Sequence, residues 1–386
     1  MRYDFVVLGA TGLQGRIASK DLLTSGYSVL LMGRDKQRVN PLLKKFNKSG
    51  FEYFEAQNID DLARKLKNSG ASIAVNCVEG DWNLQILSAC IKANVNCLDL
   101  DAEIPITKKQ FEMSPIFKKH NIINITGCGS VPGTGNVMLR YAAEKFDRMR
   151  TIEAGFSYVP NMQKFVVPFS IQSVIEEFTD LAPTIANGNT VIKTPLENIR
   201  RMYHRGIGTQ PEFIVDHAEI FTFERYYREK GLKNLRFYAG FPEAHFKPVM
   251  AFIEAGLGSK KPTISIKGLK RKISPMSCLT QALKEVKVPE GYKETENLWV
   301  KIWGTKSGKS KVILMECVVP TLKGWEEDYT NIDTGMPISI MAQMIKKGII
   351  TEKGTFSPEG IVPPLPYFQE LRKRKMIVYE NGKVIN

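Results

Sequence analysis

Three glycines near the start of the chain, at positions 9, 12 and 15, form a candidate phosphate-binding turn. They lie in the run Gly9-Ala10-Thr11-Gly12-Leu13-Gln14-Gly15, between the apolar segment 5–8 and a helix-forming segment. Glycines there let backbone N–H groups approach a pyrophosphate, which the positive end of the helix dipole also favours. The spacing departs from the commoner G-x-G-x-x-G, and a purely structural turn is the alternative. The context favours dinucleotide binding by Gly9, Thr11, Gly12, Leu13 and Gly15.

The next apolar segment, residues 29–32, runs into residues that distinguish the two nicotinamide cofactors. Enzymes that use NAD usually place a carboxylate at this strand end, whereas NADP enzymes use Arg or a small residue that admits a phosphate. Gly33 leaves space, and Arg34 can pair bidentately with a 2′-phosphate while Asp35 caps the following helix. In the alternative, Asp35 binds the ribose and Arg34 is solvated. The pattern favours NADP, with NAD still possible.

The first third of the chain alternates short apolar runs with helical segments. The predicted strands are 5–8, 29–32, 51–55, 72–77, 96–100 and 121–125, and the predicted helices are 13–24, 36–46, 60–68, 83–93 and 108–119. Strands without polar alternation are typical of sheets that are covered on both faces. The rhythm predicts an α/β fold with a doubly wound parallel sheet, which forms a dinucleotide-binding domain over residues 1–130.

The middle of the chain has a different character. Residues 151–158, 213–214, 263–266, 298–303 and 311–319 are β-like and rich in aromatics, with helical pieces at 136–146, 173–177 and 246–255. This pattern predicts a second domain, of α+β class, over residues 131–332 and around a mixed or antiparallel sheet. Residues 333–386 form a third segment that begins with a predicted helix at 336–347.

Composition limits the classes of protein to consider. The chain has 386 residues, 43% of them hydrophobic, which excludes wholesale disorder. With no apolar run long enough for a membrane span and no leader-like N-terminus, we expect a cytoplasmic protein without a membrane partner. The net charge of +14 is scattered, with its densest cluster at 372–375, so we expect no specific nucleic-acid partner. Six cysteines without a CxxC pair predict reduced thiols and no metal site.

Five further stretches, in order along the chain, resemble the saccharopine dehydrogenase-like family. Asn76-Cys77-Val78-Glu79-Gly80 and the segment 86–101 resemble its strand, "ACIKAGV" helix and "Y-x-D" strand end. The turn at 127–136 resembles its "G-x-x-P-G-x-x-N/H" turn. Residues 202–209 resemble its "FYTSGLST" stretch, and residues 334–360 resemble its last conserved segment. Together these matches cover most of the chain.

The resemblance implies a Rossmann domain into which an α+β substrate and dimerisation domain is inserted, with C-terminal helices that return to the cofactor domain. The family includes saccharopine reductases and dehydrogenases, lysine 6-dehydrogenase and carboxynorspermidine dehydrogenase. Each of these enzymes interconverts a C–N single bond and an imine. Val131 replaces the Asp of the glutamate-forming saccharopine reductases, and 156–160 lacks their "C-G-G-L-P" pattern. These departures favour a branch similar to lysine 6-dehydrogenase. A homodimer is expected.

The candidate site residues follow from strand ends and from the resemblance. Asp101 and His204, beside Tyr203, are the candidate acid–base groups, although a lone histidine is more often structural. For substrate binding we expect Glu79 and Thr209, Glu103 together with Asp101 at an ammonium group, and Arg205 at a carboxylate; solvated loop residues are the alternative. The remaining candidates for cofactor binding are Cys77, Val78, Gly129 and Gly133.

The sequence therefore predicts an NAD(P)-dependent oxidoreductase that acts on a C–N bond of a small amino-acid or polyamine-like substrate. The alternative is a non-catalytic dinucleotide-binding sensor or scaffold protein. Turnover of such amines with a nicotinamide cofactor distinguishes the two, because a sensor binds the cofactor without turnover.

Overall fold

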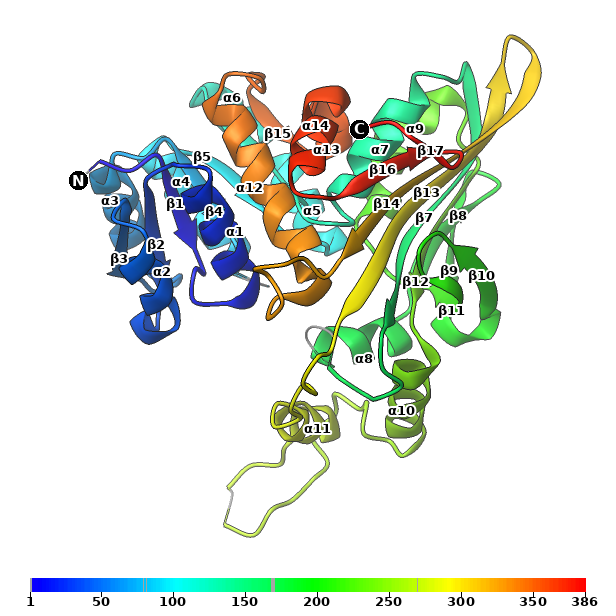
Figure 1. Ribbon diagram of the computed structural model, residues 1–386, viewed down its shortest axis with the longest axis horizontal. Coiled ribbons are helices and arrows are strands. Elements are labelled where there is room, and N and C mark those ends of the chain that lie inside the picture. The colour runs from blue at the N-terminus through cyan, green and yellow to red at the C-terminus, as the bar shows by residue number, and fades with distance from the viewer. Residues whose placement is uncertain (1, 79, 81, 168–170, 269) are drawn as a thin grey trace.

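Two β-sheets organise the computed structural model, which describes residues 2–386 except 79, 81, 168–170 and 269. The first sheet is parallel throughout and forms the lobe drawn at the left of Figure 1. Its strands, in spatial order, are β15 (Gly354–Phe356), β6 (Ile123–Ile125), β5 (Asn96–Asp99), β4 (Ile73–Asn76), β1 (Phe5–Leu8), β2 (Val29–Gly33) and β3 (Ser49–Tyr53). The order β3-β2-β1-β4-β5-β6 is that of a Rossmann fold, which confirms the predicted fold class.

Helices cover both faces of this sheet because its strands are apolar on both sides. In β1, Phe5 and Val7 pack in the larger core, whereas Val6 and Leu8 pack in a second core on the opposite face. The helices are α1 (Leu13–Thr24), α2 (Asn40–Lys45), α3 (Ile59–Ser69), α4 (Trp82–Ala93), α5 (Ile104–Glu112) and α6 (Ser114–Lys119), and a 3₁₀ turn, η1 (Lys36–Val39), precedes α2.

Two predicted helices are each divided in the structure. The segment 36–46 is a 3₁₀ turn followed by α2, with Pro41 in the first turn of α2. The segment 108–119 is divided between α5 and α6, with Pro115 in the first turn of α6. Proline lacks the N–H group that a continuous helix needs, and it is tolerated at a helix start. The sequence prediction missed both breaks.

The second sheet is mixed, as predicted, and forms the lobe at the right of Figure 1. Its strands, in order, are β10 (Arg200–His204), β11 (Gly208–Ile214), β12 (Asn234–Gly240), β7 (Arg148–Pro160), β13 (Glu294–Lys306), β14 (Lys309–Pro320), β16 (Ile377–Glu380) and β17 (Lys383–Val384). The hairpin of β8 (Ala182–Ala186) and β9 (Asn189–Lys193) extends from β12. The pair β12–β7 is parallel and the other pairs are antiparallel.

The helices of this part are α7 (Thr134–Ala143), α8 (Ile171–Thr179), α9 (Glu219–Tyr227), α10 (Glu243–Glu254) and α11 (Pro275–Leu283), with short 3₁₀ turns η2 (Pro195–Asn198) and η3 (Arg228–Lys230). The predicted strand at 263–266 does not form; Ile264 makes an isolated bridge with Ile273. Ile266 is 45% exposed, so the segment has no buried face that would hold a strand in place. The central strand β12 was missed.

The C-terminal segment contributes to both sheets. It contains η4 (Tyr329–Asn331), α12 (Ile332–Lys346), α13 (Pro358–Ile361) and α14 (Pro364–Lys373). Helix α12, orange in Figure 1, packs against α1, and β15 joins the edge of the parallel sheet beside β6. Strands β16 and β17 instead extend the mixed sheet beside β14. Part of the segment thus returns to the dinucleotide-binding domain, and its last strands do not.

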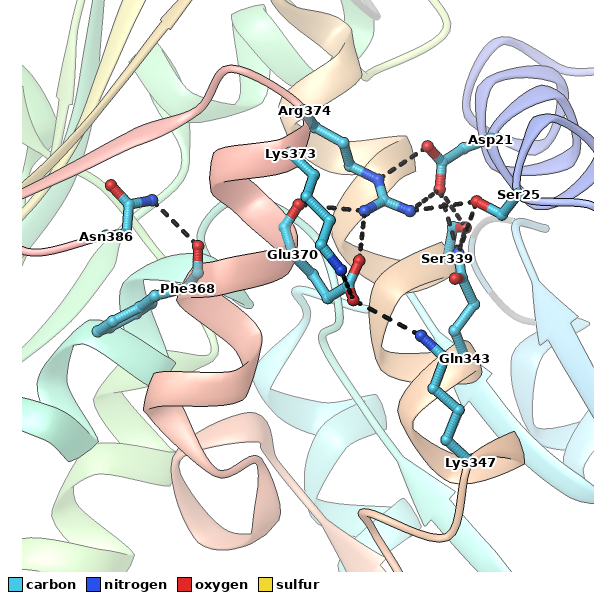
Figure 2. A network of polar contacts seen from close by, with 10 residues as sticks. All are labelled: Asp21, Ser25, Ser339, Gln343, Lys347, Phe368, Glu370, Lys373, Arg374 and Asn386. Atoms are coloured by element: carbon cyan, nitrogen blue, oxygen red, sulfur yellow. Dashed lines mark hydrogen bonds and ion pairs between the residues drawn. The ribbon is translucent and has the colours of Figure 1, made fainter.

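A buried polar network fixes α1 against α12 and α14 (Figure 2). Arg374 donates from Nε and Nη2 to the two carboxylate oxygens of Asp21, each at 2.8 Å. Ser339 of α12 donates to Asp21 at 2.6 Å, and Arg374 also pairs with Glu370 at 3.0 Å. We call Asp21, Ser339, Glu370 and Arg374 the helix clamp. Arg374 belongs to the basic cluster at 372–375, but its side chain is used internally.

Candidate functional site

The loop between β1 and α1 has the shape that a pyrophosphate cradle requires. Gly9 has φ of +75°, and a Cβ atom there would lie 2.8 Å from the backbone oxygen of Cys77. A Cβ at Gly15 would lie 2.2 Å from the oxygen of Gly9. Gly12 is the N-cap of α1 and provides no side-chain cap. The first N–H groups of the helix are therefore available to an anion, and the residues present fit a dinucleotide.

The end of β2 closes the adenosine side of this turn. Ala10 N–H donates to Met32 at 3.0 Å, and a Cβ at Gly33 would lie 2.4 Å from the methyl group of Thr11. Arg34 follows and is exposed. The Asp35 carboxylate accepts a hydrogen bond from Gln37 N–H at 3.0 Å and caps η1, as the sequence predicted. Asp35 is thus engaged in capping, and Arg34 is available to a 2′-phosphate.

A cleft of about 740 Å³ opens beside this turn, between the two lobes. Gln14 of α1, Cys77 and Val78 line it where the parallel strands end. Ligands of open α/β sheets bind at this edge, next to the point where the strand order reverses between β1 and β4. The predicted Glu79, which follows Val78, lies outside the described residues.

The loop between β6 and α7 forms another wall. Gly129 and Gly133 are bridged to each other, and a Cβ at Gly133 would lie 1.8 Å from the oxygen of Gly129. This close approach requires glycine and turns Ser130 and Val131 toward the cleft, which both of them line. Gly129 also lies against Thr334 of α12, where a Cβ would be 3.1 Å from the Thr334 methyl carbon. The C-terminal helix therefore supports the turn.

Carboxylic acids dominate the described lining of the cleft, which contains nine of them and a single lysine, Lys260. The acids come from both lobes and from the C-terminal helix: Asp101, Glu103, Glu176, Glu177, Asp180, Asp216, Glu294, Glu296 and Asp333. No three described His, Cys, Asp or Glu side chains are arranged to hold a metal ion. A strongly acidic cleft in a chain of net charge +14 favours an organic cation as ligand.

Asp101, a predicted catalytic residue, lies on the cleft after β5. Thr107 and Gln110 donate to its Oδ2 at 2.9 and 3.4 Å. Burial, together with repulsion from Asp99, raises the pKa of Asp101 to about 8. Glu103, predicted to bind substrate, is exposed at the start of α5 and lines the same cleft. These two positions are compatible with their predicted roles, which remain predictions.

A second acidic group comes from β13 and α12. Glu294 accepts from Tyr292 at 2.5 Å and from Thr330 at 3.0 Å. Glu296 and Asp333 hydrogen-bond to each other. Burial and repulsion from Asp333 raise the pKa of Glu296 well above its usual value, and burial raises the pKa of Asp333 to about 7. The pair therefore shares a proton near neutral pH.

Helix α8 contributes the third acidic group. Glu176 and Asp180 pair with Lys260 at 3.2 and 2.9 Å. Glu177 has a buried Oε2 atom without a hydrogen-bond partner among the described residues, and burial raises its pKa to about 8. A bound cation would restore the ionised form of such a carboxyl.

The structure does not bring the four predicted residues of the β10–β11 hairpin to the cleft. His204 is 2% exposed, bonds Glu212 through Nε2 at 3.0 Å, and lies 5.4 Å from the Trp299 ring. Tyr203 is 71% exposed and pairs with Thr209 across the hairpin. Arg205 binds Glu316 at 3.4 Å. His204, Glu212 and Trp299 share the face of the mixed sheet opposite the core, because side chains alternate along strands.

Sequence reasoning missed Glu294, Glu296, Asp333 and the acids of α8. A signal was present in β13, where Glu294 and Glu296 alternate in phase with Leu298, Val300 and Ile302, which are fully buried. Two carboxylates on the apolar face of a strand indicate a buried charged site. The predicted strand began at residue 298 and so excluded both.

Models of known families match nearly the whole chain. Residues 5–125 match the saccharopine dehydrogenase NADP-binding domain, and residues 129–377 match the saccharopine dehydrogenase C-terminal domain. The chain belongs to the saccharopine dehydrogenase family. This confirms the resemblance found in the sequence and the prediction of an NADP-binding domain. As a member of this family the protein is an NAD(P)-dependent oxidoreductase that acts on amine substrates.

Individual relatives agree with the family assignment. Carboxyaminopropylagmatine dehydrogenase from Synechocystis sp. is 24% identical over 95% of this chain and 94% of its own length. Carboxynorspermidine synthase from Vibrio alginolyticus is 21% identical over 85% of this chain and 82% of its own length. Saccharopine dehydrogenase (L-Glu forming) from Saccharomyces cerevisiae has the same fold, with a TM-score of 0.79 over 100% of both chains at 11% identity.

Proposed function

We propose that the substrate is an amine with at least two positive centres, one of whose nitrogens carries the C–N bond that the enzyme oxidises or forms. The acidic lining of the cleft, nine carboxylic acids against one lysine among its described residues, carries this proposal. The names of two relatives, carboxyaminopropylagmatine dehydrogenase and carboxynorspermidine synthase, suggest a polyamine with a carboxyalkyl substituent.

Different residues of the chain would bind the cofactor and the substrate. The glycine turn and Arg34 would hold the dinucleotide, whose nicotinamide supplies or accepts the hydride when bound. The Glu296–Asp333 pair and Glu177 would hold the cationic nitrogens, since each is a carboxyl without a compensating basic side chain in the described lining. Binding of the substrate lowers the pKa of these carboxyls and releases protons. The two lobes would exclude water from the reacting carbon.

A substrate panel tests the proposal. Carboxyaminopropylagmatine, carboxynorspermidine, saccharopine and lysine are each offered with NADP⁺ or NAD⁺, and nicotinamide absorbance is recorded. We expect turnover of the carboxyalkyl polyamines, with a KM about tenfold higher after Glu296→Gln, as expected for loss of one charged contact. Turnover of lysine alone would contradict the polyamine assignment. Cofactor binding without turnover of any amine would support the alternative sensor function.

The cofactor site has its own test. Gly12→Val is expected to abolish NADP binding in calorimetry, since the side chain would occupy the approach to the helix N-terminus. Arg34→Ala is expected to weaken NADP by about tenfold and to leave NAD unchanged, because only NADP carries the 2′-phosphate. Equal losses for both cofactors would contradict the predicted role of Arg34.

We also propose a cytoplasmic homodimer formed through the outer face of the mixed sheet. Val312 is 45% exposed and pairs with Trp303 on this face, beside a small apolar cluster that contains Tyr238 and Trp299. Val312→Glu is expected to convert a dimer to a monomer in analytical ultracentrifugation. A wild-type monomer would contradict the proposal. No helix among the described residues has the length and apolar character that a membrane crossing requires.

A further inference from the structure

The loop between β11 and α9 brings a histidine to the wall of the cleft. His217 lines the cleft beside Asp216. Backbone hydrogen bonds fix the loop at both ends: Val215 N–H donates to Phe237 at 3.1 Å, and Ala218 N–H donates to Ala102 at 3.0 Å. The second bond connects this loop directly to the loop that carries Asp101. His217 is therefore held at a defined place between the two lobes.

The ring of His217 has a fixed orientation. It stacks on Phe237, with centroids 3.9 Å apart and planes within 3° of parallel. Its Nδ1 pairs with Oε2 of Glu219, which is 1% exposed. A carboxylate accepts a hydrogen bond, so the proton of the neutral ring lies on Nδ1 and the lone pair on Nε2. Nε2 has no protein hydrogen-bond partner within the described part of the chain.

The other three histidines, all of them described, are placed differently. His204 is buried on the opposite face of the mixed sheet. His245 uses both nitrogens, with Tyr158 at 2.7 Å and with Lys164 O at 3.2 Å, and burial lowers its pKa to about 4. His120 is exposed at the end of α6. His217 combines a place on the cleft with an orienting carboxylate, the arrangement that general bases require.

We propose that His217 is the acid–base residue of this enzyme, with Glu219 as its positioning residue; this inference rests on the proposed function. In the oxidising direction, an N–H bond of the substrate ammonium breaks, its electron pair stays on nitrogen, and the proton goes to Nε2. The bound nicotinamide, in its oxidised form, would accept the hydride that the neutral amine releases from its adjacent carbon, which leaves an iminium. In the reducing direction, Nε2–H returns the proton to nitrogen.

Several titratable groups line the cleft together with His217. Asp216 flanks His217 on the loop, and Asp101 and Glu103 line the cleft from the loop joined to it through Ala102. Glu177 and Asp180 of α8, with Lys260, line the same cleft. The Oε2 atom of Glu219, in contact with Nδ1, lies where it offsets the positive charge that the ring gains when Nε2 takes the proton.

The test uses full-length His217→Gln and Glu219→Gln, with His120→Gln as the matched control. We expect His217→Gln to lower kcat by about 10²–10⁴, with NADP affinity retained and the pH dependence of kcat from the base lost. Glu219→Gln is expected to keep a pH-dependent kcat with a displaced midpoint, because the ring remains but its orientation and tautomer change. His120→Gln is expected to match the wild type.

Imidazole ¹⁵N shifts of the wild-type protein provide a readout that needs neither turnover nor cofactor. We expect the Nδ1–H tautomer at His217 and its loss in Glu219→Gln. A Nε2–H tautomer in the wild type, or a His217→Gln variant with kcat within threefold of wild type, would overturn the proposal. A wild-type protein that binds NADP but turns over no amine would instead overturn the proposed function, and this inference with it.

Discussion

The helix clamp and the cleft both bury carboxylates, but they treat their charges in opposite ways. In the clamp, Asp21 is 6% exposed and receives two hydrogen bonds from Arg374 and one from Ser339. Although burial opposes it, Asp21 and Glu370 raise the pKa of Arg374, so its guanidinium stays charged. In the cleft, Glu177 and the Glu296–Asp333 pair have no arginine, and the pKa of each is raised.

This difference distinguishes buried carboxylates with a structural role from those that bind a ligand. When arginine pairs with a buried carboxylate, the negative charge is compensated within the chain. In the helix clamp this pair fixes α1, the helix at the dinucleotide turn, against the C-terminal helices. The charge of a buried carboxylate without a basic partner is compensated only when a cationic ligand binds. The chain has 54 Lys and Arg residues, 14 more than its Asp and Glu residues, so a shortage of basic side chains does not explain the uncompensated cleft. Removing charges should therefore destabilise the clamp and stabilise the unliganded cleft.

The largest effect is expected in the clamp. Arg374→Met leaves Asp21 buried without its counter-charge and should lower the free energy of unfolding by about 3–5 kcal/mol in urea denaturation. Arg372→Met, an exposed position on the same helix, is the control and should change stability by less than about 0.5 kcal/mol. Equal losses of stability in the two variants would show that the ion pair of the helix clamp contributes no more to stability than an exposed arginine does.

The next effect is the pH dependence of the stability of the wild-type protein. The pKa values of Asp101 and Glu177 are about 8 and that of Asp333 about 7 in the folded protein, whereas the unfolded chain releases these protons near pH 4. Between pH 6.5 and 8.5 the folded state holds more protons, so stability falls as pH rises, by up to about 1.4 kcal/mol per pH unit for each of these carboxyls that is still protonated in the folded state. The depressed pKa of His245, about 4, acts below this window.

Chemical denaturation at several pH values, without cofactor or substrate, measures this slope. Stability that is constant or rises between pH 6.5 and 8.5 would contradict an uncompensated cleft. A saturating polyamine substrate should flatten the slope, because the bound cation lowers the carboxyl pKa values toward those of the unfolded chain.

Removal of a single carboxyl from the cleft should change the pH-dependent stability in the same direction, by a smaller amount. Glu177→Gln removes a carboxyl whose Oε2 has no hydrogen-bond partner among the described residues, and it should stabilise the unliganded protein at pH 8.5 by at least about 1 kcal/mol. At pH 5.5 the gain should be smaller, because the cost of holding this proton in the folded state grows with each pH unit above about 4, where the unfolded carboxyl titrates. Destabilisation at both pH values would indicate a structural role for Glu177 in place of a ligand-binding one.

The smallest effect is expected at an exposed ion pair, which sets the scale. Lys92 and Asp60 lie 2.6 Å apart, with side chains 54% and 84% exposed. Asp60→Asn should change the free energy of unfolding by less than about 0.5 kcal/mol, and salt should reduce even that. A loss comparable to that of Arg374→Met would mean that burial does not distinguish these pairs.

Much of the fold and part of the site could be predicted from local sequence. The buried runs of β1, β2, β4 and β5 and the glycine turn were identified because their signals lie within a few adjacent residues. The same holds for Asp35 at the start of η1 and for Asp101 at a strand end. The prediction failed where partners are distant: β12 is held by β7 and β11, and the polar–apolar alternation in its own sequence is limited to residues 234–237.

The chain's sequence by itself determined a Rossmann sheet, a dinucleotide turn and membership of a family of amine oxidoreductases. Only the tertiary structure decided which ionisable groups face the substrate. It turned His204 to the outer face of a sheet, paired Arg374 with Asp21 across 353 residues, and gathered Glu177, Glu296 and Asp333 from three separate elements. Whether a charge is compensated depends on neighbours in space, and these neighbours come from distant parts of the chain.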